Sequence, residues 1–131
     1  EDEPESSAAQ YEEEIHRVMG HSPRFELIIL GMGADAHTAS LFPGSPALRE
    51  TGRHVVSNYV EKLGAHRLTL TLPLINRAEQ VIILAFGQEK AQALAHALKE
   101  PEDVNQYPVQ GVRPTSGRLL WIVDRAAALP L

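Results

Sequence analysis

The spacing of hydrophobic positions near the N-terminus predicts an amphipathic helix. Apolar residues recur there every three or four positions, which places them on one face of a helix. They are Ala8, Tyr11, Ile15, Val18 and Met19. We expect this helix to begin after an N-cap at Ser6 or Ser7 and to end at Gly20.

Two nearly continuous apolar runs, at residues 25–30 and 81–86, predict strands. Each run is followed by a glycine, Gly31 or Gly87. Runs of this kind are typical of strands that are buried on both faces of a parallel sheet. We therefore expect the first run to be a central strand. The residues after the second run are expected to form a helix at 88–99.

The remaining elements are shorter and complete an alternation of helices and strands. We expect strands at 55–60, 67–72 and 119–123, and short helices at 74–78 and, capped by Asp124, at 124–128. This alternation predicts one α/β domain over residues 1–131, with an open, mostly parallel Rossmann-like sheet and helices on both faces. Ligands of such sheets bind at the carboxyl ends of the strands, so chemistry is expected at that edge.

The charge of the chain is unevenly distributed. The net charge is −5, but residues 1–14 hold seven acidic groups and no Lys or Arg, and the rest of the chain has 10 acidic and 12 basic residues. A mildly cationic body suits a small anionic ligand. It lacks the basic stripe with interleaved aromatic residues that nucleic-acid binding requires, so no nucleic-acid partner is expected.

Other features of the composition favour a soluble, cytoplasmic protein. The chain has no cysteine, which leaves no sign of an oxidising compartment. Its apolar runs are far shorter than the roughly 20 residues of a membrane-spanning helix, and its N-terminus is acidic where a signal peptide would be basic. We expect no membrane partner.

The loop after the first apolar run carries the strongest candidate for chemistry. Gly31 and Gly33 let the backbone turn tightly and approach a ligand, and Asp35 and His37 follow two residues apart. A carboxylate beside a histidine can fix its tautomer and make it a better base. On spacing alone, however, a structural turn with a capping aspartate and a hydrogen-bonded histidine is the more common arrangement.

Two basic residues are candidates for binding an anion. Lys90 falls in the first turn of the expected helix at 88–99, where a cation is unfavourable by about 0.3–1 kcal/mol unless it has a partner. A phosphate would be one such partner, and Glu89 or solvent would be another. Arg67 ranks lower, because it begins its strand and so lies at the wrong end if that strand is parallel to the first.

The other histidines show no metal-ligand spacing, and we expect no metal site. They are His16, His21, His54, His66 and His96. Ser40 and Ser45 lack the setting of a serine nucleophile.

Residues 31–44 resemble the motif of the 6-phosphogluconolactonase family. They read Gly-Met-Gly-Ala-Asp-Ala-His-Thr-Ala-Ser-Leu-Phe-Pro-Gly, and the family motif is Gly-x-Gly-x-Asp-Gly-His-Thr-x-Ser-Leu-Phe-Pro. The resemblance continues through residues 68–78, 87–91 and 114–121 in the family's order. It implies the fold shared by glucosamine-6-phosphate isomerases and 6-phosphogluconolactonases. It also implies hydrolysis of 6-phosphogluconolactone to 6-phosphogluconate, in the pentose phosphate pathway, without a cofactor or metal.

The same resemblance implies a role for each candidate residue. His37 would deprotonate the attacking water and Asp35 would orient its imidazole, while backbone N–H groups of residues 33–36 would stabilise the oxyanion. Lys90 and the backbone at 87–88 would hold the phosphate. The full set expected to bind substrate is Gly31, Gly33, Ala36, Thr38, Arg67, Gly87 and Lys90.

The chain departs from the family in two ways. Ala36 stands where the family has glycine, and a positive φ at this position would cost an alanine of order 1 kcal/mol. The phosphate loop and the Asp-Glu-Arg segment that precede this region in the family are also missing. We therefore expect the chain to be the C-terminal part of a larger domain, with a second chain as one source of the missing half.

Two alternatives to a lactonase stay open. One is an inactive fragment or subunit that only binds a sugar phosphate. The other is an amino-sugar-phosphate isomerase/deaminase, which shares the fold and a related turn. The continuation at residues 38–43 favours the lactonase over the deaminase.

Overall fold

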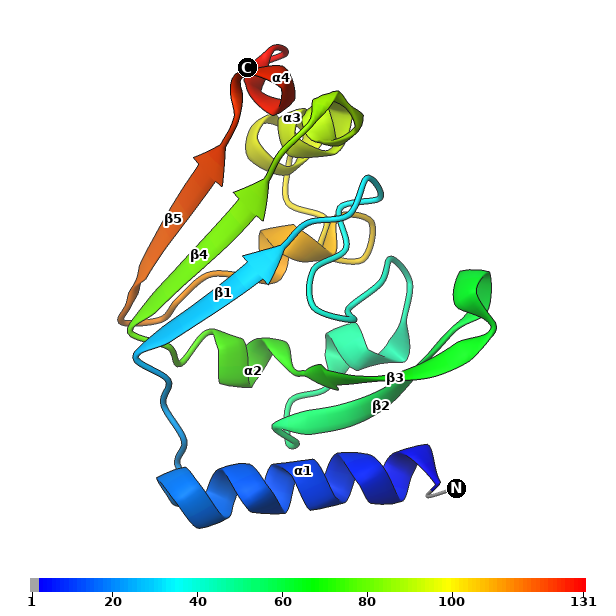
Figure 1. Cartoon of the computed structure of the whole chain (residues 1–131), viewed down its shortest axis with the longest axis vertical. Coiled ribbons are helices and arrows are strands. Elements are labelled where there is room, and N and C mark those ends of the chain that lie inside the picture. Colours follow the sequence, from blue (N-terminus) through cyan, green and yellow to red (C-terminus); the bar gives the residue numbers. More distant parts are fainter. Residues whose placement is uncertain (1–2) are drawn as a thin grey trace.

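A parallel three-stranded sheet forms the main body of the structure, a computed structural model that describes residues 3–131 (Figure 1). Its strands are β1 (Leu27–Gly31), β4 (Gln80–Ala85) and β5 (Arg118–Val123), in the order β1-β4-β5. Both neighbouring pairs are parallel. The carboxyl ends of all three strands therefore meet at one edge, as expected, but β4 is the middle strand and β1 lies at the side of this sheet.

The two other strands form a separate antiparallel hairpin. They are β2 (Val55–Val60) and β3 (Ala65–Leu70), joined by a 3-10 turn at Glu61–Leu63. Gly64 closes the turn in the left-handed conformation, with φ 57. The strand expected at 67–72 is thus shifted and does not join the parallel sheet. The helix α2 (Leu72–Ile75) follows it directly.

The helix α1 (Pro4–Met19) packs on this hairpin. Its buried residues Ala8 and Ile15 form a small apolar cluster with Val55 and Leu74. The helix begins earlier than expected, with Glu3 as N-cap and Pro4 in the first turn. Proline fits there because the first N–H groups of a helix need no intrahelical acceptor.

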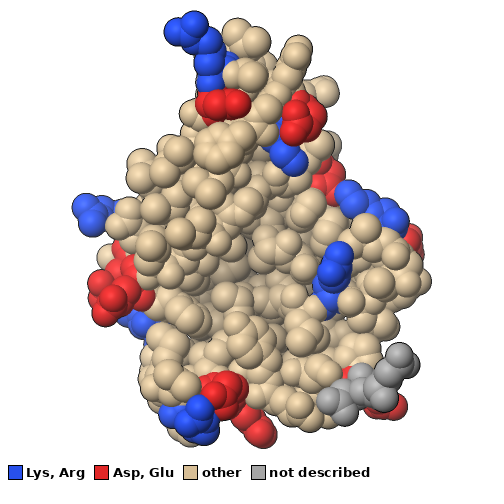
Figure 2. All heavy atoms as spheres, in the orientation of Figure 1, with Lys and Arg blue, Asp and Glu red and all other residues tan. Residues whose placement is uncertain are grey.

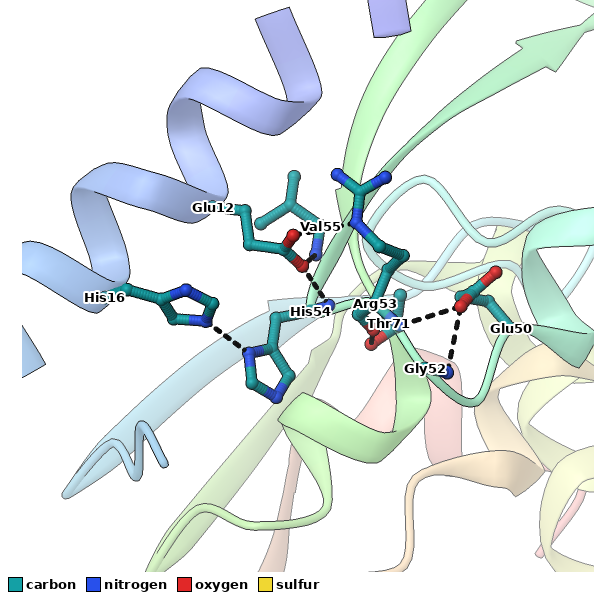
Figure 3. Close-up of polar contacts among 8 residues, drawn as sticks. All are labelled: Glu12, His16, Glu50, Gly52, Arg53, His54, Val55 and Thr71. Atoms are coloured by element: carbon teal, nitrogen blue, oxygen red, sulfur yellow. Dashed lines mark hydrogen bonds and ion pairs between the residues drawn. The ribbon is translucent and has the colours of Figure 1, made fainter. Parts of the chain in front are cut away.

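The Glu12 carboxylate fastens α1 to the start of β2 (Figure 3). It accepts hydrogen bonds from the backbone N–H groups of His54 and Val55, the latter at 3.1 Å, and from Nε of Arg53 at 2.7 Å. Burial raises the pKa of Glu12, but these hydrogen bonds outweigh it, and the pKa lies below its usual value. The carboxylate is therefore ionised at neutral pH and ties the helix to the hairpin.

Two helices cover one face of the parallel sheet. They are α3 (Ala91–Lys99), which follows a 3-10 turn at Gln88–Lys90, and α4 (Arg125–Ala128). Ala93, Leu94 and Ala127 of these helices belong to the main apolar core with Ile28 and Leu30 of the sheet. The half-buried ring of Trp121, on β5, packs against the same core.

The cap expected at the start of α4 is present. Asp124 Oδ1 accepts a hydrogen bond from the Ala127 N–H at 2.8 Å. The same carboxylate also accepts the N–H of Gly87, at 3.1 Å, so it links α4 to the end of β4.

The opposite face of the sheet carries exposed apolar side chains. Leu27 is 47% exposed and Ile29 is 58% exposed, whereas the alternate residues Ile28 and Leu30 are buried. Figure 2 shows few charged side chains over the region where Figure 1 draws the sheet. The mostly parallel α/β architecture is confirmed, but within residues 3–131 β1 is buried on one face only. Among these same residues, no helix has the length and apolar character needed to cross a membrane.

Two alanines in the loop after β1 adopt positive φ, 63 at Ala36 and 50 at Ala39. This conformation costs a non-glycine residue about 1–2 kcal/mol. Ala36 is 1% exposed and belongs to the main core, so its methyl group regains about 0.8 kcal/mol from burial. Ala39 is exposed and gains nothing comparable.

Glycine at position 39 is therefore expected to be more favourable than glycine at position 36. Ala39→Gly should raise the free energy of unfolding by about 0.5–1 kcal/mol, because it relieves the backbone without loss of packing. Ala36→Gly should change it by less than about 0.5 kcal/mol, because the gain and the loss nearly cancel. Urea unfolding of both variants measures the difference, and a larger gain at position 36 would contradict this account.

A side chain at Gly117 is expected to be poorly tolerated. A Cβ there would lie 2.2 Å from the Ala78 carbonyl oxygen and 2.6 Å from that of Glu79, both backbone atoms. Gly117→Ala should lower the free energy of unfolding by about 1–3 kcal/mol. Gly52→Ala is the matched control, because its nearest neighbour is the Glu50 carboxylate at 3.5 Å. Equal midpoints of urea unfolding for the two variants would show that the backbone yields at position 117.

Candidate active site at the carboxyl edge of the sheet

The loop after β1 is closed on itself by hydrogen bonds. The N–H of Gly33 donates to the His37 carbonyl at 2.9 Å, and the N–H of Ala36 donates to the Gly33 carbonyl at 3.0 Å. The Thr38 hydroxyl donates to the Gly31 carbonyl at 2.7 Å. These bonds fold the loop back over the end of β1 and hold His37 at the edge of the sheet.

Gly33 is required by the side chains that lie over it. A Cβ at this position would be 2.1 Å from His37 Nδ1 and 2.7 Å from Asp35 Oδ1. No side chain fits in that space without displacing the imidazole. The glycine therefore lets both functional groups approach the backbone at the strand end.

Asp35 orients the imidazole of His37. Its Oδ1 lies 2.5 Å from His37 Nδ1 and accepts the His37 backbone N–H at 3.1 Å. With the proton on Nδ1, Nε2 is left as the basic nitrogen. The His37 side chain is 27% exposed, so water can reach it. Its ring stacks on Phe42, with centroids 4.2 Å apart and planes at 20°.

The Asp35 carboxyl stays ionised over the whole physiological range. Burial raises its pKa, but hydrogen bonds from Lys62 and His37 outweigh this effect and lower the pKa to about 2. Lys62 Nζ lies 2.7 Å from Asp35 Oδ2. Lys62 is absent from the sequence-based candidates, and nothing in its local pattern signals that the tip of a hairpin reaches Asp35.

A hollow of about 360 Å³ brings four of the expected residues together. Gly31, Gly33, His37 and Lys90 line it, with apolar residues from the end of β1. We call it the His37–Lys90 hollow. It has the size of a small-molecule site and lies at the edge where a parallel sheet binds ligands.

Lys90 is half-buried at the positive end of α3, as the last residue of the 3-10 turn that precedes it. The helix expected at 88–99 thus begins as a 3-10 turn. None of the ion pairs formed among residues 3–131 involves Lys90, so Glu89 does not offset its charge there. This position of Lys90 favours a role in binding an anion over a role in a surface ion pair.

Four of the residues expected to bind substrate have other contacts or positions in the structure. Thr38 is fully buried and Ala36 nearly so, and both serve the shape of the loop. The Gly87 N–H is engaged by Asp124, which removes it as a free donor. Arg67 is exposed within β3, opposite Asn58, and does not line the His37–Lys90 hollow.

Of the other histidines, His96 lines a neighbouring hollow with Asp35, whereas His16 and His54 lie elsewhere in the fold. His16 Nε2 and His54 Nδ1 are 2.8 Å apart at the junction of α1 and β2 (Figure 3). Within residues 3–131, no three side chains of the metal-binding types converge on one point.

Comparisons with known proteins identify the family of the chain. The model of a family described as glucosamine-6-phosphate isomerases/6-phosphogluconolactonase matches residues 1–121. A 6-phosphogluconolactonase of Synechocystis sp. is 43% identical over 129 residues, covering 95% of this chain and 52% of the relative.

Two solved structures have the same fold as the chain. The crystal structure of the devB protein superposes with a TM-score of 0.91 at 30% identity, covering 100% of this chain and 56% of the other. The 6-phosphogluconolactonase of Trypanosoma cruzi superposes with a TM-score of 0.85 at 31% identity, covering 98% and 52%. The chain spans about half the length of curated relatives such as the 6-phosphogluconolactonases of Synechocystis sp. and Bos taurus. With the family model matching nearly its whole length, the chain belongs to the glucosamine-6-phosphate isomerase/6-phosphogluconolactonase family.

Proposed function

We propose that the chain is the C-terminal part of a 6-phosphogluconolactonase, with His37 as catalytic base. One observation carries the proposal: a carboxylate-oriented histidine and a cation without an ion-pair partner among residues 3–131 line the same hollow. A phosphorylated lactone presents the two groups that this pair would serve, a phosphate and an ester carbonyl.

In the proposed reaction, Lys90 binds the phosphate and sets the lactone carbonyl near His37. Nε2 of His37 takes a proton from a water molecule as that water attacks the carbonyl carbon. The ring carbon–oxygen bond then breaks, the imidazolium returns the proton to the departing ring oxygen, and the opened product carries a carboxylic acid and a hydroxyl group. Asp35, ionised and bonded to Nδ1, stabilises the imidazolium that forms. No step of this reaction requires a metal or an organic cofactor.

Backbone N–H groups of the loop are proposed to stabilise the oxyanion. Of residues 33–36, Gly33 and Ala36 already donate within the loop. The N–H groups of Ala34 and Asp35 are therefore the candidates for this role.

Sequence supports the lactonase over the isomerase/deaminase branch of the family. The continuation at residues 38–43 matches the lactonase motif, and the Synechocystis relative is named 6-phosphogluconolactonase. An inactive sugar-phosphate-binding fragment is the second candidate, and the exposed sheet face favours it if nothing covers that face.

We also propose that this exposed face is covered in the working protein. The chain covers 52% of the length of the Synechocystis relative, and the uncovered side chains of β1 are apolar. The proposed cover is protein equivalent to the other half of those relatives, on the same chain or on a second one. Intact-mass analysis of the purified protein would show it as a longer chain or as a second polypeptide. A single 131-residue species with full activity would contradict it.

A cytoplasmic location is part of the proposal. It rests on the absence of cysteine and of any sign of an oxidising compartment.

Replacement of His37 should slow catalysis strongly and leave substrate binding intact. His37→Ala is expected to lower kcat for lactone hydrolysis by about 10²–10⁴-fold, because it removes the general base, with little change in KM. His66→Ala, on the exposed side of β3, is the matched control and should keep the wild-type rate. Equal rates for His37→Ala and the wild type, measured by acid release, would eliminate the catalytic assignment.

Replacement of Lys90 should affect binding more than turnover. Lys90→Met is expected to raise KM by about 10–100-fold, because a hydrogen bond to a charged group contributes roughly 1.5–3 kcal/mol. Inorganic phosphate should compete with the substrate in the wild type and not in the variant. Lys99→Met, at the far end of α3, is the control. An unchanged KM for Lys90→Met would place the phosphate elsewhere.

A further inference from the structure

We propose that Lys62 is a positioning residue for the reaction, which acts by holding Asp35 in the orientation that fixes the tautomer of His37. The inference rests on the proposed role of His37 and adds a residue that neither the sequence motif nor the family description contains. It places part of the catalytic apparatus on the β2–β3 hairpin.

A continuous line of contacts runs from Lys62 to the imidazole. Lys62 Nζ lies 2.7 Å from Asp35 Oδ2, and Asp35 Oδ1 lies 2.5 Å from His37 Nδ1. The two carboxylate oxygens are thus divided between one cation and one imidazole. Because Lys62 occupies Oδ2, the carboxylate cannot turn about its bond without losing one of these contacts.

Phe42 provides a second link between the same two residues. His37 stacks on its ring, and Lys62 Nζ lies 5.3 Å from the centre of that ring. A cation and an aromatic face attract one another at this distance. Lys62 and His37 therefore share two neighbours, Asp35 and Phe42, which limits the freedom of both side chains.

The β2–β3 hairpin is hydrogen-bonded to the loop after β1. These bonds fix the position of the turn that carries Lys62. The Asn58 side chain donates to the Ser40 carbonyl at 2.8 Å, and the Ser40 N–H donates to the Thr69 hydroxyl at 3.2 Å. Both hairpin side chains are buried. Lys62 follows in the turn at Glu61–Leu63, where Gly64 allows the chain to reverse.

The position of Lys62 distinguishes a positioning role from a role in substrate binding or in folding stability. Lys62 lines a neighbouring hollow of about 440 Å³, with Asp35 and Phe42, and does not line the His37–Lys90 hollow. Its side chain is 58% exposed, and ion pairs as exposed as this add little to folding stability. Its loss should therefore be felt in the geometry of His37.

Three variants of the purified protein, with any chain that accompanies it, test the proposal. Lys62→Met removes the charge and keeps the length of the side chain, Lys62→Arg restores a donor, and Lys99→Met is the control for the loss of a surface lysine. We expect Lys62→Met to lower kcat by about tenfold with less than a twofold change in KM, because only the base is misaligned. Lys62→Arg should recover most of the rate, and Lys99→Met should match the wild type.

Nitrogen-15 NMR of the His37 ring gives a readout that needs no substrate. In the wild type the proton should reside on Nδ1, facing Asp35, and in Lys62→Met the ring should show a mixture of both tautomers. An unchanged tautomer in Lys62→Met overturns the proposal, whatever the rate. If the wild type hydrolyses no lactone, the proposed function fails, and the tautomer still decides the role of Lys62.

Discussion

The site depends on a close contact between the imidazole ring of His37 and the backbone of Gly33, which has no side chain. His37 occupies the space that a Cβ at Gly33 would fill, and the Gly33 N–H also donates a hydrogen bond to the His37 carbonyl. The Asp35 carboxylate uses the same space. The buried hydroxyl of Thr38 donates to the Gly31 carbonyl at the end of β1 and helps to keep this arrangement closed.

Parallel pairing of β1 with β4 brings the two halves of the site together. The register pairs Gly31 with Leu84, so the loop after β1 and the turn after β4 leave the sheet side by side. His37 comes from the first and Lys90 from the second. The separation of His37 and Lys90 is thus set by strand pairing, and it needs no direct contact between the two segments.

Much of this could be predicted from the sequence, because it depends on local patterns. The apolar runs that became β1 and β4, their glycine ends and the cap at Asp124 are all signalled by neighbouring residues. The pairing of β2 with β3 was not predicted, because period-two alternation fixes which face a strand buries and says nothing of its partner.

The same limit applies to the site itself. The pairing of Asp35 with His37 follows from their separation of two residues, whereas the contact of Lys62 with Asp35 spans 27 positions and depends on the hairpin. Thr38 and Ala36 lie within the motif, yet they are buried rather than exposed to a ligand, because motif membership does not separate residues that shape a loop from those that touch substrate.

The only tryptophan of the chain, Trp121, packs against the larger of two apolar clusters. The smaller cluster, under α1, contains no tryptophan and meets the larger one through Phe25 and Leu70. Tryptophan fluorescence, excited at a wavelength where tyrosine does not absorb, therefore reports on the environment of the parallel sheet. A transition in which α1 and the hairpin loosen first would appear in circular dichroism before it appears in emission, so the two cores can be followed as separate optical signals.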